Sequence, residues 1–281
     1  MSRELIIEHR SDAVRAEITT TAGSGQVWRA WAEPEILSQW FTDRARGRAR
    51  AGTTMTWIFD RFRMELPYDV IIAEHERRLV LKGSPVGRPP YLMEILVAPR
   101  DTGTHLTVIN SGFTVGSGAE EQRDGVLSGW KMALVILKHY LENYFEQDRE
   151  SFFAMQPAPF TYDQILPRFL TATGLSSWLT RDGAIGAPGD SYRLTLTGGQ
   201  TMSGRVLVVT GSEVAVTWDE IHGVAELKAF LLGPRTRAVS VRGCGWGLSC
   251  ERAVEIEKMM AAAVDRLVAD LSEHAGHPQS V

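Results

Sequence analysis

The sequence predicts an α+β protein built from two tandem, related domains, each an antiparallel sheet around a long C-terminal helix. Two phrases nearly repeat each other, LSQWFT at residues 37–42 and LSSWLT at residues 175–180. Each is followed by segments in which apolar and polar residues alternate, the pattern of strands with one buried face. Each half then ends in a segment whose apolar residues recur every three or four positions, the pattern of an amphipathic helix. Shared landmarks in a shared order are typical of internal duplication.

Length and composition allow two soluble domains. The 281 residues suffice for two units of ordinary size, and 44% hydrophobic with 23% charged residues is typical of soluble proteins. A net charge of -4 gives no reason to expect nucleic acid or an anionic membrane as a partner. The most apolar run, residues 132–137, is too short to cross a bilayer. We therefore expect a cytoplasmic protein with no nucleic-acid and no membrane partner.

We expect the first domain to span residues 1–150. Val14, Ala16 and Ile18 alternate with polar residues, which predicts an opening strand over residues 14–20. Two short helices broken at Pro34 follow, because proline interrupts a helix. Alternation then predicts strands of an antiparallel meander at residues 55–59, 62–66, 70–72, 79–81, 91–97 and 104–110. A helix over residues 126–145 closes the domain, and its broad apolar surface indicates the wall of a cavity.

We expect the second domain to span residues 157–275 and to be reduced. Pro157 and Pro159 predict a linker, with the boundary near Gln156. No clear opening strand precedes Tyr162 unless residues 152–155 serve, so the second sheet is expected to be smaller. The predicted strands lie at residues 192–196, 205–209, 214–218, 225–232 and 238–241, and a helix containing Ile256 to Leu271 closes the domain.

One segment has no counterpart in the second half. Residues 114–125 are rich in glycine and acidic residues, which is consistent with a mobile lid or with a tolerated insertion. The general tolerance of surface loops favours the insertion.

No metal site or cofactor is expected. Cys244 and Cys250 are six residues apart, which fits neither a zinc nor a redox motif, and the histidines form no recognisable pair. The glycines at 243, 245 and 247 have the wrong spacing for a dinucleotide loop. The arginines at 44, 46, 48 and 50 could hold an anion, but the solvated face of an edge strand is the favoured interpretation.

Titratable residues give no catalytic constellation. Arg63, Glu94 and His105 are out of phase with the apolar residues, which favours a solvated outer face over catalysis. Tyr91 and His139 are further candidates, and a packing role is favoured for His139. We therefore name no catalytic residue, and we lean toward a protein that is not an enzyme.

Five motifs resemble a known family: VWRAW at residues 27–31, LSQWF at 37–41, RLV at 78–80, TVINSGF at 107–113 and GWKMAL at 129–134. Together they are similar to the START-like, or helix-grip (SRPBCC), superfamily, in the branch resembling the C-terminal domain of the Hsp90 ATPase activator. The resemblance covers nearly all of residues 1–150 and is weaker over residues 157–275. It implies a curved antiparallel sheet gripping a long helix, with a cavity between them that binds lipids, polyketides or other apolar molecules.

The resemblance and the alternation together predict a set of ligand contacts. Trp40 and Trp178 are expected to be core anchors rather than contacts, because a repeated aromatic residue suits the junction of a helix and a sheet. For the other inward residues, a core role is equally expected. The predicted ligand-binding residues are Trp57, Phe59, Met64, Met93, Asn110, Trp130, Leu134 and Leu137.

Relatives of this kind include polyketide aromatases and cyclases, co-chaperones, and proteins that protect producers of enediyne antibiotics by sacrificing their own backbone. Backbone cleavage would occur at a glycine, and Gly112 and Gly245 are the candidates, although a turn or a close backbone approach is the favoured role of both.

The leading hypothesis is a non-catalytic binder of a hydrophobic small molecule, acting in sequestration or self-resistance in bacterial secondary metabolism. One alternative is a polyketide cyclase or aromatase. The other is an Hsp90-type co-chaperone module, with a chaperone as protein partner.

Overall fold

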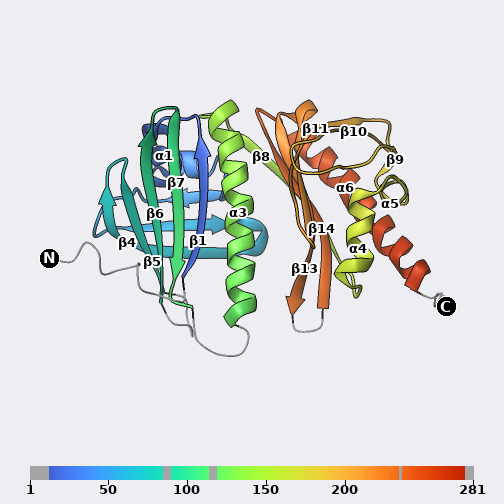
Figure 1. The fold of residues 1–281 in the computed structure, drawn as a ribbon, viewed down its shortest axis with the longest axis horizontal. Coiled ribbons are helices and arrows are strands. Elements are labelled where there is room, and N and C mark those ends of the chain that lie inside the picture. The colour runs from blue at the N-terminus through green and yellow to red at the C-terminus, as the bar shows by residue number, and fades with distance from the viewer. Residues whose placement is uncertain (1–12, 85–89, 114–118, 234–235, 276–281) are drawn as a thin grey trace. The chain divides into compact units, whose positions relative to one another are not determined.

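The computed structural model describes residues 13–84, 90–113, 119–233 and 236–275 (Figure 1). The chain divides into two compact units, Met1–Gln147 and Asp148–Val281. Each unit holds one antiparallel sheet with seven described strands and ends in a long helix. The expectation of an α+β protein with two tandem domains of this kind is therefore confirmed.

The first unit begins with β1 and ends with α3. Its strand order is β1-β7-β6-β5-β4-β3-β2, so the first strand of the chain pairs with the last strand of the sheet. Its elements are β1 (Val14–Thr20), α1 (Ser24–Ala32), α2 (Pro34–Leu37), β2 (Arg44–Arg46), β3 (Thr54–Phe59), the 3-10 helix η1 (Asp60–Phe62), β4 (Met64–Glu74), β5 (Arg78–Gly83), β6 (Tyr91–Arg100), β7 (Gly103–Ser111) and α3 (Ala119–Asn143).

The second unit repeats this plan. Its strand order, β8-β14-β13-β12-β11-β10-β9, is that of the first unit with each strand number raised by seven. Its elements are β8 (Arg149–Pro157), α4 (Tyr162–Leu170), α5 (Ala172–Ser176), β9 (Thr180–Asp182), β10 (Ser191–Leu196), β11 (Thr201–Val209), β12 (Glu213–Trp218), η2 (Asp219–Ile221), β13 (Gly223–Gly233), β14 (Thr236–Trp246) and α6 (Cys250–Ala275).

The second unit is not reduced, which corrects the expectation of a smaller sheet. The missing opening strand is β8, which pairs with β14 from Arg149 to Pro157. Pro157 therefore ends a strand instead of starting a linker, and the units divide between Gln147 and Asp148 rather than near Gln156. A proline is tolerated there because β8 lies at the edge of the sheet, where one row of backbone groups has no strand to pair with.

One strand of the first sheet was predicted as two. β4 runs unbroken from Met64 to Glu74, but its register against β5 shifts between Val70 and Ile72. A bulge of this kind adds a residue to one strand and changes the phase of the alternation. The exposed Phe62 lies in η1, outside the strand. The segment 114–125 is partly described: residues 114–118 lie outside the described residues, and the rest belongs to α3.

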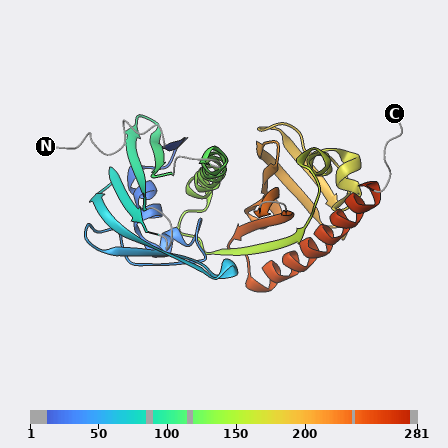
Figure 2. The same ribbon diagram turned by 90° about the horizontal axis from the view of Figure 1, so that it is seen from below.

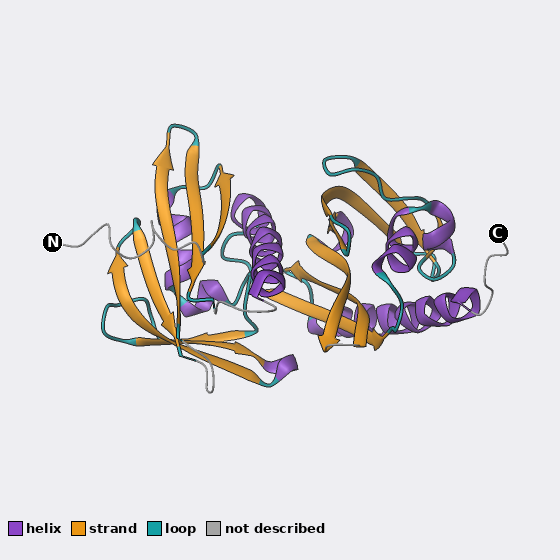
Figure 3. Cartoon of the chain, turned by 60° about the horizontal axis from the view of Figure 1, so that its bottom comes forward, coloured by secondary structure: helices purple, strands orange, loops and turns teal. Residues whose placement is uncertain are grey.

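The first sheet curls around α1 and α2, and α3 lies across the open side of the curl (Figure 2). Its strands change direction strongly from one edge of the sheet to the other (Figure 3). The helix is fastened to β1 through Glu142, whose carboxylate accepts hydrogen bonds from the Thr20 hydroxyl at 3.0 Å and the Thr21 amide at 2.9 Å. In the second unit α6 runs alongside β8 (Figure 2). No helix in the described part of the chain is long and apolar enough to cross a membrane.

The repeated phrases LSQWFT and LSSWLT have the same structural role in both units. The indole nitrogen of Trp40 donates to the carbonyl of Ala30 at 2.8 Å, and that of Trp178 donates to the carbonyl of Arg168 at 2.8 Å. Each bond spans ten residues and ties the phrase to the first short helix of its unit. Both rings are almost fully buried. The expected role of the two tryptophans as core anchors is thus confirmed by their packing.

We predict that Trp178→Phe lowers the stability of the chain by about 1–3 kcal/mol, because it removes a buried indole and leaves the partly buried carbonyl of Arg168 without this partner. Urea denaturation followed by circular dichroism measures the change. Leu231→Ala is the control in the same unit, since Leu231 is 51% exposed and its truncation should change stability by less than about 0.5 kcal/mol. Equal effects of the two substitutions would contradict the anchoring role.

Candidate functional site

The inner face of the first sheet carries a continuous array of aromatic rings. Ring centroids lie 4.6 Å apart for Trp57 and Tyr68, 5.2 Å for Phe41 and Trp57, and 5.7 Å for Phe41 and Trp130. Trp31 joins the array 5.8 Å from Trp130. The rings come from β3, β4, α1, α3 and the segment after α2, so the array exists only when sheet and helices are assembled. We refer to these five residues as the aromatic array.

The aromatic array reaches from the core to the surface. Trp31 and Trp57 are almost completely buried, whereas Phe41 is only partly buried. Phe59, whose ring lies 5.7 Å from that of Phe41, is also partly exposed. A closed core would bury all of these large apolar rings, because each gains free energy by leaving water. The array thus presents aromatic surface both inside the unit and at its edge.

A pair of tyrosines lies at one end of the array. The Tyr91 hydroxyl donates to the Tyr68 hydroxyl at 2.8 Å. The two residues stand on β4 and β6 and are both opposite Gly83 of the strand between them. A Cβ atom at Gly83 would lie 2.5 Å from the Tyr91 ring, so only glycine lets this ring lie across β5. Burial and the neighbouring Tyr91 raise the pKa of Tyr68 far above its usual range, which keeps this phenol protonated.

Asn110 lies beside this pair on the same face of the sheet. It pairs with Met93 of β6 and with Val14 of β1. Along β7 it lies two residues before the position that is opposite Tyr91. Diagonal neighbours of this kind are close enough for long side chains to meet. Asn110 is 7% exposed, and its carboxamide makes no hydrogen bond to any described residue. The structure therefore brings a polar group to the inner face next to two phenols.

The structure separates the predicted ligand contacts into three groups. Trp57 and Trp130 belong to the aromatic array, and Phe59 lies at its edge. Met93 and Asn110 are buried on the sheet, and Leu134 and Leu137 are buried on α3. Met64 is 38% exposed at the start of β4, immediately after η1 and Arg63, so its side chain is not enclosed by the unit.

Sequence reasoning missed Trp31, Phe41 and Tyr68 as members of this face. Tyr68 is two residues before Val70, and the alternation already pointed Val70 inward, so this signal was available. Trp31 and Phe41 lie outside the sheet. Their positions depend on how the short helices pack, and no local sequence pattern predicts that packing.

The second unit encloses an apolar core instead of a similar array. Its buried cluster includes Phe152, Trp178, Tyr192, Trp218 and α6 residues such as Met260. Its ring contacts include the pairs Phe152 with Trp218 and Phe169 with Trp178. Its inner tyrosine is satisfied internally, because the Tyr192 hydroxyl donates to the Thr217 carbonyl at 2.5 Å. The first unit therefore offers the better candidate site.

Gly112 and Gly245 both have local structural reasons to be glycine. Gly112 has a φ of +100°, and a Cβ there would lie 2.9 Å from the carbonyl oxygen of Pro90. A Cβ at Gly245 would lie 2.5 Å from the carbonyl oxygen of Ile221. The favoured explanation, a turn or a close backbone approach, accounts for both positions. Gly112 directly follows β7 and approaches the backbone of Tyr91, so it is also near the candidate site.

Of the titratable candidates, Tyr91 belongs to the tyrosine pair, whereas Arg63, His105 and His139 lie outside the aromatic array. Arg63 has a left-handed backbone conformation after η1 and is exposed. The Thr19 hydroxyl and the His105 ring are 3.3 Å apart. His139 packs its ring against Tyr144 on the same helix.

Glu94 corrects the expectation of a solvated outer face. It is 4% exposed and forms an ion pair with Arg78. Burial raises the pKa of its carboxyl group, and Arg78 opposes that change. Glu94 does lie on the face opposite Met93 and Ile95, as its out-of-phase position indicated. Its ion pair with Arg78 allows the carboxylate to be buried on that face.

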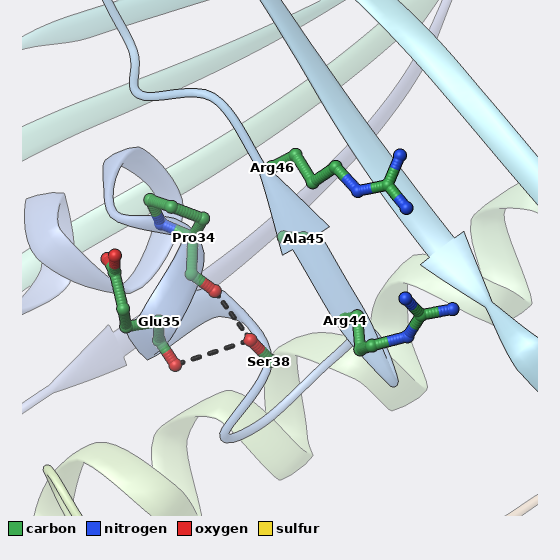
Figure 4. A pocket seen from close by; sticks show the side chains of 6 residues that line it. All are labelled: Pro34, Glu35, Ser38, Arg44, Ala45 and Arg46. Atoms are coloured by element: carbon green, nitrogen blue, oxygen red, sulfur yellow. Dashed lines mark hydrogen bonds between the residues drawn. The ribbon is translucent and has the colours of Figure 1, made fainter.

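A small pocket of about 230 Å3 lies outside the aromatic array, between α2 and the edge strand β2 (Figure 4). Pro34, Glu35, Ser38, Arg44, Ala45 and Arg46 line it. The Ser38 hydroxyl donates to the carbonyl of Pro34 at 2.5 Å. Arg44 pairs with Asp60 and Arg46 lies 3.9 Å from Glu65, so the two cations are matched by carboxylates. The interpretation as an exposed edge-strand face is confirmed for Arg44 and Arg46, whereas Arg48 and Arg50 are exposed but lie beyond the end of β2.

No group of three potential metal ligands from His, Cys, Asp and Glu occurs in the described part of the chain. Cys244 is buried, and burial raises the pKa of its thiol, while Cys250 is exposed. Its burial and raised pKa make the Cys244 thiol a poor nucleophile.

We predict that Gly83→Ala displaces the Tyr91 ring and breaks its hydrogen bond to Tyr68. Near-ultraviolet circular dichroism, which reports ordered aromatic side chains, should change, while the far-ultraviolet spectrum stays that of a folded chain. Gly52→Ala controls for the loss of a glycine, because a Cβ there meets nothing within 4 Å although its φ of +81° adds backbone strain. An unchanged near-ultraviolet spectrum for Gly83→Ala would contradict the close approach of the two residues.

Three solved structures are examples of chains with a similar fold. DynU16, described as a protein of the dynemicin biosynthetic locus, is 19% identical with a TM-score of 0.43, and the match covers 95% of this chain and 100% of that one. The di-domain ARO/CYC BexL from the BE-7585A biosynthetic pathway is 13% identical with a TM-score of 0.44, covering 95% and 99%. Protein MLL2253 from Mesorhizobium loti is 20% identical with a TM-score of 0.42, covering 46% and 96%.

No curated protein matches this chain. Residues 22–142 match the family model described as Activator of Hsp90 ATPase homolog 1-like protein. This segment contains the helices α1 and α2, the sheet from β2 to β7 and nearly all of α3, which are the elements that build the candidate site. The first unit is therefore similar to the Activator of Hsp90 ATPase homolog 1-like family over these residues, and the second unit repeats its strand order.

Proposed function

We propose that the first unit binds a hydrophobic small molecule against the inner face of its sheet. The observation that carries this proposal is the aromatic array, which continues from fully buried rings to partly exposed ones. Flat aromatic surfaces supply large contact areas and prefer offset or edge-on partners. A ligand that covered the exposed end of the array would remove apolar surface from water, and this supplies the driving force for binding.

The composition of the site supports binding without turnover. The inner-face positions of β5 and β6 that surround the tyrosines are Leu81, Gly83, Met93 and Ile95, all uncharged. General acid–base catalysis needs a group whose pKa lies near the working pH. The raised pKa of Tyr68 makes it a poor base at neutral pH, so it serves better as a hydrogen-bond donor.

The setting we propose is sequestration or self-resistance in bacterial secondary metabolism, as the helix-grip resemblance suggests. Within that setting, Gly112 is a better candidate for a sacrificial backbone position than Gly245. A Cβ at Gly112 would be 3.0 Å from the Cα of Tyr91, so a ligand held beside the tyrosines would lie near this backbone. Gly245 belongs to the second unit, which lacks the array.

Incubation with a reductively activated enediyne in the presence of dioxygen tests this extension. The diradical would take the Cα hydrogen of Gly112, and dioxygen would add to the resulting carbon radical before the chain breaks. We expect mass spectrometry to find a new chain end at Gly112. Cleavage at scattered positions, or an intact chain, would exclude the sacrificial role and leave the binding proposal standing.

The neutral fluorescent probe N-phenyl-1-naphthylamine tests binding directly. We predict saturable binding to the full chain, weakened about tenfold by Trp130→Leu, since losing one stacking ring costs on the order of 1.4 kcal/mol. The control is Trp246→Leu, which removes a buried tryptophan from the second unit. Circular dichroism confirms that both variants are folded. No saturable binding, or equal weakening by both substitutions, would refute a site on the array.

A further inference from the structure

The hairpin that joins β3 and β4 ends in an exposed tip with both apolar and cationic side chains. The turn consists of η1 and Arg63, and η1 is the short helix at the end of this hairpin in Figure 3. All residues from Asp60 to Met64 are exposed. Phe62, at 56%, is the most exposed large apolar residue in the described part of the chain. Arg61 and Arg63 therefore flank an aromatic ring that is open to water. We refer to residues 60–64 as the hairpin tip.

The backbone of the hairpin tip adopts a conformation that suits glycine better than arginine. Arg63 has a φ of 49° and a ψ of 42°, which is the left-handed region. A side chain is costly there, because its Cβ atom crowds the backbone. Elsewhere in the same unit Gly47 and Gly52 occupy positions with positive φ. Strained positions of this kind gather where a side chain has a function, so the arginine points to a use for this guanidinium group.

The hairpin tip is positively charged. Its one acidic residue is Asp60, whose carboxylate accepts a hydrogen bond from Nε of Arg44 at 2.8 Å. Arg63 forms no ion pair with any described residue. The net charge of -4 for the whole chain gave no reason to expect an anionic partner. Charges on a protein surface act over about 10 Å at ordinary salt concentrations, so the local arginines decide what the tip attracts.

The apolar side of the hairpin tip continues into the aromatic array. Met64 pairs across the hairpin with Phe59, and residues at paired positions lie on the same face of a sheet. The Phe59 ring lies 5.7 Å from that of Phe41, which belongs to the array. A surface that covered Phe62 and Met64 would therefore lie close to the exposed end of the array.

The size and charge of the hairpin tip favour a lipid surface over a protein partner. Stable protein interfaces bury about 800 Å² on each partner, whereas the tip presents only two large apolar side chains, Phe62 and Met64. Tip-to-tip contact between two copies of the chain would bring arginines against arginines, which is unfavourable. A bilayer requires no shape complementarity. Its interface accepts aromatic rings at the level of the headgroups, and anionic headgroups attract arginines.

We propose that the hairpin tip docks the first unit onto an anionic lipid surface. The side chains of Phe62 and Met64 enter the boundary between headgroups and acyl chains, while Arg61 and Arg63 contact the lipid phosphates. One aromatic ring, one thioether and two cations provide weak attachment, so the docking is peripheral and reversible. It requires no ligand on the aromatic array and therefore goes beyond the proposed function.

Cosedimentation of the full chain with sucrose-loaded vesicles tests the docking in the absence of any ligand. Vesicles of phosphatidylcholine with about one-third phosphatidylglycerol are compared with vesicles of phosphatidylcholine alone. We expect a dissociation constant on the order of 1 mM lipid for the anionic vesicles, and binding about tenfold or more weaker to the neutral ones. Raising NaCl from about 0.1 M to about 0.5 M should weaken binding to the anionic vesicles about fivefold or more, because salt screens the arginines.

Two variants separate docking from folding. Phe62→Ser should weaken binding to the anionic vesicles about tenfold, because it removes the apolar ring. Arg63→Gly should weaken that binding about fivefold while the midpoint of thermal unfolding stays the same or rises, because glycine suits the left-handed position.

Two controls remove similar side chains near the opposite end of the sheet, where the antiparallel order of β3 to β7 places them. Ile71→Ser removes an apolar side chain of β4 that is 45% exposed. Arg100→Ser removes an exposed arginine at the end of β6. Both controls should bind the anionic vesicles as the native chain does.

Three results would overturn this inference. If the chain binds neither kind of vesicle, the lipid assignment is wrong and a protein is left as the partner of the hairpin tip. If it binds both kinds equally, the arginines do not recognise anionic headgroups. If Phe62→Ser and Arg63→Gly bind no more weakly than Ile71→Ser and Arg100→Ser, another surface makes the contact. Since no ligand is present, each of these results is independent of ligand binding by the aromatic array.

Discussion

Each unit depends on one buried hydrogen bond between an indole and the backbone. Trp40 and Trp178 fill the junction between two short helices and a sheet, and each donates to a carbonyl ten residues earlier. A large apolar ring with one polar atom suits this position, because the ring packs between layers while its N–H satisfies a carbonyl at the end of a helix. With the short helices fixed in this way, the sheet can curl around them and the long helix can complete the unit.

The two units have the same strand order but different buried residues. The second encloses an apolar cluster in which the phenol of Tyr192 is matched by a backbone acceptor. The first places an aromatic array across the same layers and leaves several donors unmatched beside it. Duplication preserves a fold because the strand order and the anchors are retained in both copies, and buried indole donors without a partner occur in both, at Trp31 and Trp57 of the first unit and at Trp218 of the second. The aromatic array is the feature on which we base the proposal that the first unit binds a ligand.

Glycine determines the shape of the polar end of the site. Gly83 stands between two tyrosines on neighbouring strands, and without a side chain it allows their hydroxyl groups to meet across β5. Gly112 similarly admits the backbone of Tyr91 close to the end of β7. The polar end of the candidate site is therefore built from cross-strand neighbours and not from residues close in sequence. For this reason no local sequence motif predicts it.

The sequence by itself determined the duplication, the class of fold and the anchors, because hydrophobic periodicity and the LSQWFT and LSSWLT phrases are local properties. It placed Trp57, Met93 and Asn110 on one face of the sheet, since alternation has a fixed period of two. Tertiary structure alone decided that β8 opens the second sheet, that Glu94 is buried with Arg78, and that Trp31, Phe41 and Tyr68 join one array. These features depend on strand pairing and helix packing between residues far apart in the chain, and such contacts leave no periodic signal in the sequence.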